Sequence, residues 1–309
     1  MRILVTGGAG FIGSHTVDAL IQGGHKVSVF DNLSSGKRDQ VNSGARLYEA
    51  DLREAKTVAD VLEREKPELV FHFAAQMDVR RSVADPAFDA EVNLVGLLNL
   101  MEAGRRNGLR RVIFASTGGA IYGEQEVFPC DEDHPRHPVS PYGVAKLASE
   151  HYLFFYRVEY GIDYMALRYS NVYGPRQDPH GEAGVVAIFC GRMLEGKQAM
   201  IFGGGEQTRD YIFIGDVVAA NLAALGADVT GALNIGTGIE TSVNGLYAEL
   251  AGAAGISAAA GYAPRRVGEQ MRSVISPQRA EQALKWRAEV PLKEGLGRTW
   301  RFFKDRAGK

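Results

Sequence analysis

The stretch VTGGAGFIGSH (residues 5–15) decides the fold, because a short apolar run gives way there to closely spaced glycines and then to a helical pattern. Gly7, Gly10 and Gly13 fit one spacing of a dinucleotide-binding turn, and Gly8, Gly10 and Gly13 fit the commoner one. Glycine suits such a turn because the backbone needs unusual angles and a pyrophosphate must approach it closely. Free N–H groups at the start of the helix then bind phosphate. The stretch therefore predicts a Rossmann-type dinucleotide site.

Asp31 indicates which dinucleotide is bound. It ends the next apolar run, KVSVFD (26–31), where a carboxylate can accept hydrogen bonds from the adenosine ribose and repel a 2′-phosphate. This favours NAD over NADP. Lys37 and Arg38 follow closely and leave a phosphate-bearing cofactor as an alternative, and a simple turn-forming Asp is another.

Short apolar runs alternate with helical patterns through the first half of the chain. This alternation predicts an α/β fold, a doubly wound parallel sheet (Rossmann) with helices on both faces. The second half is less regular and predicts a smaller mixed α/β lobe that binds the substrate. The expected strands are 2–7, 26–31, 45–50, 68–75 and 111–116, and the expected helices are 11–24, 53–65, 184–197 and 216–227. The expected NAD-binding domain is 1–170 with a return segment 211–238, and the expected substrate lobe is 171–210 with 239–309.

Composition limits the partners. The chain has 309 residues, of which 45 % are hydrophobic, and a net charge of −2, so neither nucleic acid nor an anionic membrane is an expected partner. Cys130 and Cys190 lie far apart in no metal-ligand spacing, so neither a metal site nor a disulfide framework is expected. No signal peptide or bilayer-length apolar run is recognised, and a cytoplasmic location is the resulting expectation.

Two helical segments are more apolar than packing on a sheet requires. They are AFDAEVNLVGLLNLMEA (87–103) and the segment after Pro141, which includes YLFFY (152–156). A helix that is apolar almost all round buries a second face. The partner of that face could be another part of this chain or a second copy, and we predict a homodimer built on these helices.

Tyr142 and Lys146 carry the candidate chemistry, in SPYGVAKLASEHY (140–152). Residues four apart share one face of a helix, so both side chains can point at one ligand. A nearby ammonium and the positive nicotinamide ring of NAD⁺ can together lower the pKa of a phenol, which is ordinarily about 10. The pair is therefore predicted to act as a general base on a sugar or alcohol hydroxyl while hydride leaves the same carbon. A surface lysine beside a half-buried tyrosine is the alternative.

A third polar group is expected at the end of the fifth strand, in FASTGGAIYGE (114–124). Ser116 or Thr117 could hydrogen-bond the reacting oxygen there, and the sequence leaves the choice between them open. An ordinary polar strand end is the alternative.

With these residues identified, the chain resembles the extended short-chain dehydrogenase/reductases of the NAD-dependent epimerase/dehydratase family, and most closely the bacterial UDP-glucose (UDP-galactose) 4-epimerases. The resemblance covers nearly the whole chain. It implies an isomerase that inverts C4 of a UDP-hexose through a 4-keto intermediate, with NAD regenerated in each cycle. The motifs that carry it are TGGAGFIGSH, FDNLSSG, HFAAQ, STGGAIYGE, SPYGVAKLASE, LRYSNVYGPRQDP, RDYIFIGDV and NIGTG.

The resemblance also implies roles for residues that match the family motifs. The implied catalytic residues are Tyr142, Lys146 and Thr117, with Ser116 as the alternative to Thr117. The implied cofactor-binding residues are Gly7, Gly10, Phe11, Ile12, Asp31, Asn32, Ser35, Gly36, Asp51, Leu52, Phe73, Ala74, Ala75, Gln76, Asn93, Tyr142, Lys146 and Tyr169. The implied substrate-binding residues are Thr117, Tyr142, Asn171, Val185, Phe202, Arg209, Arg266, Glu269 and Ser273.

Three of these residues carry specific expectations. By the resemblance, Arg209 and Arg266 clamp the diphosphate, a task that suits the forked guanidinium. The position of Ser273 gates the space beside the sugar 2-substituent in the family. A small serine predicts that UDP-GlcNAc and UDP-GalNAc also fit.

Other functions are weighed against this one. The related 4,6-dehydratases place Asp-Glu after the threonine, whereas Gly118 and Gly119 stand here and argue against water elimination. A UDP-glucuronate 4-epimerase or decarboxylase needs an extra cation for the sugar carboxylate, which the sequence does not identify. A non-catalytic NAD-binding regulator usually lacks the tyrosine–lysine pair.

Overall fold

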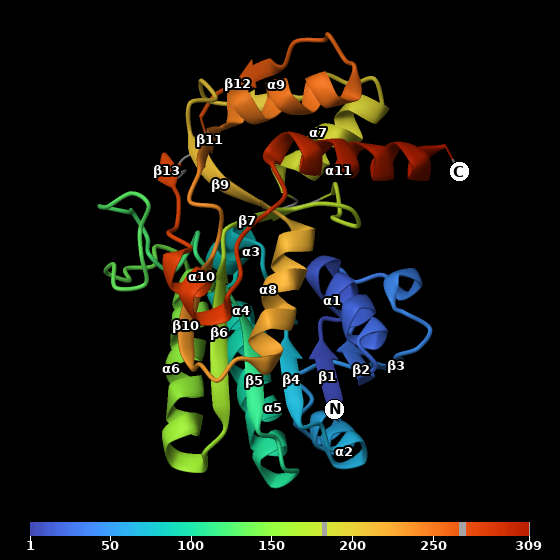
Figure 1. Cartoon of the computed structure of the whole chain (residues 1–309), viewed down its shortest axis with the longest axis vertical. Helices are drawn as coiled ribbons and strands as arrows, with labels where there is room; N and C mark the ends of the chain where they lie inside the picture. Colours follow the sequence, from blue (N-terminus) through green and yellow to red (C-terminus); the bar gives the residue numbers. More distant parts are fainter. Residues whose placement is uncertain (181–183, 266–269, 309) are drawn as a thin grey trace.

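A seven-stranded parallel sheet forms the larger part of the molecule (Figure 1). In this computed structural model, which describes residues 1–180, 184–265 and 270–308, the strand order is β10-β6-β5-β4-β1-β2-β3. The order reverses between β1 and β4, which is where open α/β sheets bind ligands. The predicted doubly wound sheet is confirmed. Its strands are β1 (Arg2–Thr6), β2 (Lys26–Asp31), β3 (Arg46–Glu49), β4 (Leu69–His72), β5 (Arg111–Thr117), β6 (Asp163–Tyr169) and β10 (Gly231–Ile235).

Alternating side chains divide the core of this sheet into two layers. Ile3 and Val5 of β1 belong to one apolar cluster, and Leu4 between them belongs to the other. Helices cover both faces because the strands in the middle of the sheet present mostly apolar side chains on both sides. On the first face lie α1 (Phe11–Gln22) and α8 (Ile214–Gly226), and on the second lie α2 (Ala55–Glu65), α5 (Gly96–Arg106) and α6 (Pro141–Tyr160).

The segment 87–103, predicted as one helix, is divided into three parts. These are α4 (Pro86–Ala90), a π-helical turn (Glu91–Val95) and α5. A π turn adds a residue to one helical turn and so changes which side chains share a face. It places Asn93 in the interior, where the side chain is 3 % exposed. A preceding short helix, α3 (Val79–Ala84), leads into this region.

The smaller lobe lies above the carboxyl ends of the large sheet (Figure 1). Its mixed sheet is centred on β9 (Thr208–Phe213), which pairs in parallel with β7 (Asn171–Tyr173) and β13 (Arg272–Ser273) and antiparallel with β11 (Glu240–Ser242). A smaller mixed lobe was predicted and is confirmed. The remaining elements of the chain are β8 (Met200–Phe202), β12 (Gly261–Ala263), α7 (Val185–Leu194), α9 (Val243–Ala254), α10 (Gln278–Leu284) and α11 (Leu292–Ala307). A 3₁₀ turn (Arg38–Gln40) connects β2 and β3 of the large sheet.

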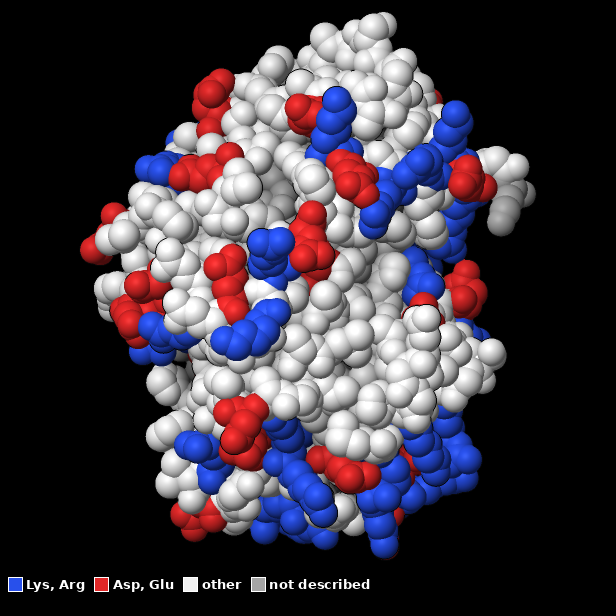
Figure 2. Space-filling view, in the orientation of Figure 1, with Lys and Arg blue, Asp and Glu red and all other residues white. Residues whose placement is uncertain are grey.

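Charges of both signs are interspersed over the face shown in Figure 2. Lysine and arginine side chains gather at its lower edge, at the end of the molecule opposite the smaller lobe. Among the described residues, none of the helices has the length and apolarity to cross a bilayer. The functional site is expected at the switch point between β1 and β4, where the strand order reverses.

Candidate active site

The turn between β1 and α1 requires glycine at two positions. Gly7 has a φ of +68°, and a Cβ there would lie 2.6 Å from the backbone N of Ala74. A Cβ on Gly13 would overlap the carbonyl oxygen of Gly7. A Cβ on Gly10 would meet only that same oxygen, at 3.2 Å, so its outer side is open. Bare backbone at the start of α1, where Phe11 and Ile12 follow, leaves room for a pyrophosphate.

The Asp31 carboxylate lies beside this turn, at the end of β2. It accepts hydrogen bonds from the backbone N–H of Ala9 at 2.9 Å and of Leu33 at 2.8 Å, and burial raises its pKa. Gly36 packs against it, since a Cβ there would lie 2.9 Å from Oδ1, and Ser35 is exposed in the same loop. The remaining lone pairs of the carboxylate are free for ribose hydroxyls, and the negative charge disfavours a 2′-phosphate.

Both cations that left a phosphate-bearing cofactor open have carboxylate partners. Lys37 lies 3.9 Å from Asp178, and Arg38 forms an ion pair with Glu49. The Lys37 ammonium and the Arg38 guanidinium therefore already have carboxylate partners, so neither is free to bind the additional phosphate of NADP. The geometry agrees with a preference for NAD.

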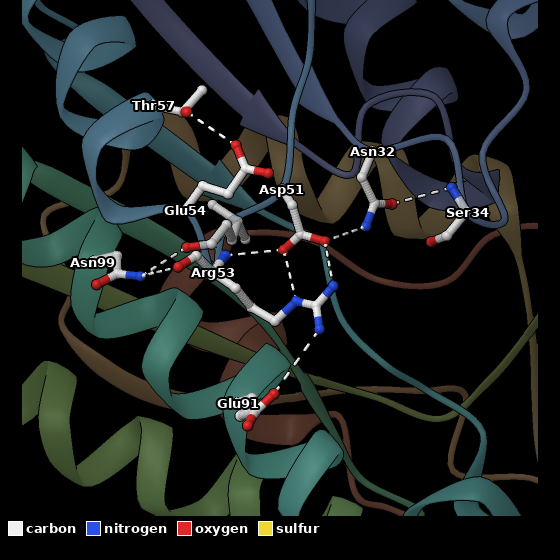
Figure 3. Close-up of polar contacts among 9 residues, drawn as sticks. Asn32, Ser34, Asp51, Arg53, Glu54, Thr57, Glu91 and Asn99 are labelled. Carbon is white, nitrogen blue, oxygen red and sulfur yellow. Dashed lines mark hydrogen bonds and ion pairs between the residues drawn. The ribbon is translucent and has the colours of Figure 1, made fainter.

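Asp51 anchors the expected adenosine end of the site (Figure 3). Asn32 donates to its Oδ2 at 3.0 Å, and the Arg53 guanidinium grips both of its oxygens. These hydrogen bonds from Arg53 hold the pKa of Asp51 down at about 2. Arg53 also lies 3.9 Å from Glu91, so it links the loop after β3 to the π turn. Residues Asp51, Arg53, Glu54, Glu91 and Val95 line a pocket of about 520 Å³ there.

Neither Arg53 nor Glu91 was predicted from the sequence. Both are exposed charged residues, and the only signal was that Arg53 stands two positions after Asp51. Leu52 is buried, and its carbonyl oxygen accepts a hydrogen bond from Asn99 at 2.9 Å. The loop that carries Asp51 and Leu52 is therefore fixed before any ligand arrives.

The loop after β4 carries the expected contacts Phe73, Ala74, Ala75 and Gln76. Asn93 clamps it, because its Oδ1 accepts from the backbone N–H of Gln76 at 3.0 Å and its Nδ2 donates to the Gln76 carbonyl at 2.9 Å. The Gln76 side chain donates to Asp78 and Asp89. The side-chain amides of Gln76 and Asn93 are thus hydrogen-bonded to other protein groups. The part of this loop left for contact with a cofactor is its backbone.

Tyr142 and Lys146 lie in the first two turns of α6, on the face towards the sheet. Ser140 caps the helix by accepting from the Gly143 N–H at 3.2 Å, and Pro141 begins it. Lys146 Nζ donates to the Ala115 carbonyl at 2.8 Å and lies 5.8 Å from the centre of the Tyr142 ring. The predicted pair is therefore brought together, with the ammonium fixed between α6 and the end of β5.

The protein alone does not lower the pKa of Tyr142. Burial, followed by the negative charge of Asp89, raises the pKa of the phenol, and burial lowers the pKa of Lys146 to about 8. The pKa of the phenol is raised although Lys146 Nζ lies 5.8 Å from the centre of its ring, so the lowering expected from the ammonium alone is not borne out. The positive charge of bound NAD⁺ is the remaining source of a lowered pKa.

Ser116 and Thr117 have different surroundings at the end of β5. Ser116 is buried, and its hydroxyl donates to Glu150 Oε1 at 2.6 Å. Thr117 is half-buried and is the register partner of Tyr169 on β6. Because the Ser116 proton is already given to Glu150, the geometry favours Thr117 as the donor to a substrate oxygen.

Glu150 belongs to a buried network that the sequence reasoning missed. Arg168 donates to its two oxygens at 3.0 and 2.6 Å and also to the Tyr122 hydroxyl at 2.8 Å, and Tyr122 in turn donates to Asn234. One signal existed, because Glu150 stands four residues after Lys146 and so shares its face of the helix. The network joins α6, β6, β10 and the loop after β5 behind the reacting pair.

The other expected substrate residues that the structure describes belong to elements of the smaller lobe. Asn171 begins β7, Val185 begins α7 and Phe202 ends β8. Arg209 and Ser273 are register partners on β9 and β13, and Ser273 is buried. Arg266 and Glu269 lie outside the described residues. In the described part of the chain no cluster of His, Cys, Asp or Glu could hold a metal ion.

The hydroxyl of Tyr169 has a hydrogen-bond partner within the protein. Tyr169 is the last residue of β6, and its hydroxyl donates to Asn221 on α8 at 2.6 Å. Asn221 also donates to Thr16 on α1. The Tyr169 hydroxyl is therefore used on the α1–α8 side of the sheet, and only the ring is left for a contact with the nicotinamide.

Comparison with known proteins gives a consistent result. Residues 3–236 match the family described as "NAD dependent epimerase/dehydratase family". The UDP-glucose 4-epimerase of Mycolicibacterium smegmatis is 46 % identical over 313 residues, which cover 99 % of this chain and 100 % of that protein.

Solved structures agree in fold and in length. The UDP-glucose 4-epimerase of Thermotoga maritima, solved with UDP-glucose, is 49 % identical with a TM-score of 0.97, and the match covers 99 % of both chains. The Thermus thermophilus UDP-glucose 4-epimerase in complex with NAD is 46 % identical with a TM-score of 0.93, over 98 % of this chain and 99 % of that one.

Proposed function

The chain belongs to the NAD dependent epimerase/dehydratase family, and we propose that it is an NAD-dependent isomerase that inverts C4 of a UDP-hexose, interconverting UDP-galactose and UDP-glucose. The observation that carries the proposal is the pair of half-buried Tyr142 and buried Lys146, with the lysine held against the end of β5, beside the switch point of the sheet. Relatives that match over nearly the whole chain are UDP-glucose 4-epimerases.

The cofactor fits the residues that would hold it. The pyrophosphate would lie on the open outer side of Gly10, and the ribose hydroxyls would donate to Asp31. The adenine would lie beside the Asn32–Asp51 contact. Phe73, Ala74 and Ala75 would lie beneath the nicotinamide end, on the loop that Asn93 clamps. When bound, NAD⁺ supplies the acceptor and later the donor of hydride for sugar C4.

The protein side chains supply proton transfer and anchoring. Tyr142 takes the proton from the sugar 4-hydroxyl, and Thr117 hydrogen-bonds the same oxygen. Arg209, with Arg266 as its expected companion, holds the diphosphate while the 4-keto sugar turns. Tyr142 then returns the proton after hydride has reached the opposite face. Lys146 keeps positive charge beside the phenol throughout.

Two domains serve these tasks. We assign 1–170 with 211–238 to NAD binding and 171–210 with 239–309 to the UDP-sugar. The pairing of β10 with β6 supports the return to the large sheet, although Tyr211–Phe213 still pair within the smaller sheet. In this division the residues expected to bind the sugar belong to the smaller lobe.

The direct test is to incubate the purified protein with UDP-galactose and measure UDP-glucose, with and without added NAD. We expect conversion that needs no net supply of oxidant or reductant, because the cofactor is regenerated. UDP-glucuronate is the comparison substrate. Turnover of UDP-glucuronate alone would replace the proposal by a glucuronate epimerase or decarboxylase, and turnover of neither would indicate a non-catalytic NAD-binding protein.

Sugar scope is proposed to depend on Ser273. This residue is small, buried and paired with Arg209, so the space beside it can admit an N-acetyl group of UDP-GlcNAc or UDP-GalNAc. We expect Ser273→Tyr to lower kcat/KM for UDP-GlcNAc by at least about 100-fold and to spare UDP-glucose, because overfilling removes room only beside the 2-substituent. Ser276→Tyr, three residues further on, is the control for general disruption. Equal losses on both sugars in Ser273→Tyr would contradict the gate.

A homodimer is proposed on α6 and the neighbouring π turn. Phe154 and Val158 are 53 % and 66 % exposed, and Val144, Phe155 and Val95 are also exposed. Apolar side chains gathered on one helix face are a common mark of an interface. Sedimentation at micromolar concentration should give a dimer, and Phe154→Glu should shift it to monomer. A wild-type monomer would refute this assembly.

Cytoplasmic residence is part of the same proposal. Cys130 and Cys190 are both free and buried. Reduced thiols are the ordinary state in a reducing compartment. Cell fractionation with an antibody to the protein would test the location.

A further inference from the structure

Asp89 is a buried carboxylate that the proposed reaction does not use, on a helix that packs against the helix of the reacting pair. It lies in the short helix α4 (Pro86–Ala90), which packs against α6, and the residue is 1 % exposed. Its Oδ1 accepts hydrogen bonds from Gln76 Nε2 at 2.9 Å and from Asn93 Nδ2 at 3.0 Å. Its Oδ2 is also closed to solvent, and no donor in the described part of the chain reaches it. A buried oxygen without a donor is costly, so its presence calls for a compensating interaction.

The charge of Asp89 acts on both groups of the reacting pair, Tyr142 and Lys146. Gln76 and Asn93 both donate to Oδ1 of Asp89, and in the described part of the chain Oδ2 has no hydrogen-bond partner. Burial raises the pKa of Tyr142 and lowers the pKa of Lys146 to about 8, and the negative charge of Asp89 is the next cause for both. The charge of Asp89 raises the pKa of both groups. At Lys146 this counteracts the lowering of the pKa by burial, and at Tyr142 it adds to the raising of the pKa by burial.

Other titratable groups around the pair leave this role to Asp89. Glu150 on α6 also faces Lys146, but it already has two hydrogen bonds from the buried Arg168. His72 on β4 is neutral, since burial lowers its pKa to about 3. The exposed charges on the neighbouring α3 and π turn are Arg80, Arg81 and Glu91. Among the described residues, Asp89 is the buried carboxylate near the pair that forms no ion pair of its own.

We propose that Asp89 is a positioning residue of the epimerase, whose buried negative charge keeps Lys146 in the ammonium form and sets the pH range in which Tyr142 acts as base. The inference rests on the proposed function. Without this charge, both groups lose their protons more readily, so Tyr142 becomes a phenolate at lower pH and Lys146 becomes a neutral amine at lower pH. A purely structural role would lower the rate or the stability and leave both transitions in place.

The first measurement is the pH profile of kcat for Asp89→Asn and the wild type, both loaded with NAD. Asparagine keeps an oxygen acceptor for Gln76 and Asn93 and removes the charge. The acid limb reports ionisation of Tyr142, and the alkaline limb reports loss of the Lys146 proton. We expect both limbs to move to lower pH together, each by about one unit.

The second measurement needs no turnover. Ultraviolet difference absorbance of the NAD-loaded protein follows phenolate formation between about pH 5 and 9, where tyrosines of ordinary pKa stay protonated. Tyr142→Phe serves as the blank, so the remaining signal belongs to one phenol. The midpoint should fall by about one unit in Asp89→Asn. Because this signal is independent of catalysis, it decides on Asp89 even in a protein that failed to epimerise any sugar.

The control is Asp85→Asn, which removes an exposed carboxylate from the start of the same helix and keeps the cap on Phe88. It should leave both limbs and the phenol midpoint unchanged. If Asp89→Asn does not fold, Asp89→Ser removes the same charge from a smaller side chain and carries the same expected shift. A folded Asp89 variant with an unchanged phenol midpoint would overturn the proposal.

Discussion

Tyr142→Phe should lower kcat for UDP-galactose by about a thousandfold while the fold and cofactor binding are retained. The phenol is the one group placed to exchange the substrate proton, and Phe keeps the ring while it removes the exchangeable proton. Stability should change little, because no group in the described part of the chain is hydrogen-bonded to the Tyr142 hydroxyl. The loss should appear in kcat and kcat/KM alike, since the interaction is made during proton transfer rather than in sugar binding.

The measurement is the conversion of UDP-galactose by matched amounts of folded protein, with bound NAD determined separately. Tyr156→Phe is the control, because Tyr156 lies on the same helix and donates to Glu102 at 3.0 Å, far from the reacting pair. It should lose some stability and keep its turnover. Wild-type kcat in Tyr142→Phe would remove the proposed base, whatever the glycine-rich turn binds.

The sheet and its cofactor edge were predictable because their signals are local. A turn that demands bare backbone at Gly7, followed by a carboxylate at Asp31, can be read within one βαβ unit. The five expected strands of the first half were found, with ends that differ by at most three residues. The largest difference is in 68–75, where Phe73 and the residues after it leave the sheet and form the loop beneath the expected cofactor site.

The parts that could not be predicted depend on contacts between distant segments. The π turn of 91–95 accompanies hydrogen bonds from Asn93 to Gln76 and Asp89, which no helical periodicity reveals. The choice between Ser116 and Thr117 depends on Glu150, a residue on another element. The raised pKa of Tyr142 depends on burial, and spacing along a helix indicates only that two side chains are neighbours.

Arg168→Met should be strongly destabilising, by about 3–5 kcal/mol in the free energy of unfolding. The guanidinium is 1 % exposed and the Glu150 carboxylate 7 %, so loss of the arginine leaves a buried negative charge with only the Ser116 hydroxyl as a donor. The Tyr122 hydroxyl also loses its donor. The effect should be larger than that of removing both charges, because Arg168→Met with Glu150→Leu leaves no uncompensated carboxylate.

Urea unfolding of the wild type, Arg168→Met and the double variant Arg168→Met/Glu150→Leu measures the order of their free energies of unfolding. Lys56→Met is the matched control, because Lys56 and Asp60 form an i,i+4 pair on the exposed side of α2, and its loss should not be measurable. If Arg168→Met were no less stable than that control, the buried pair would not support the loop after β5 and the end of β6. If the single variant unfolds as expected and the double variant recovers part of the loss, the unpaired Glu150 carboxylate is the cause. The network would then be a scaffold that keeps Thr117 and Lys146 in register, since both are attached to the strand end that it holds.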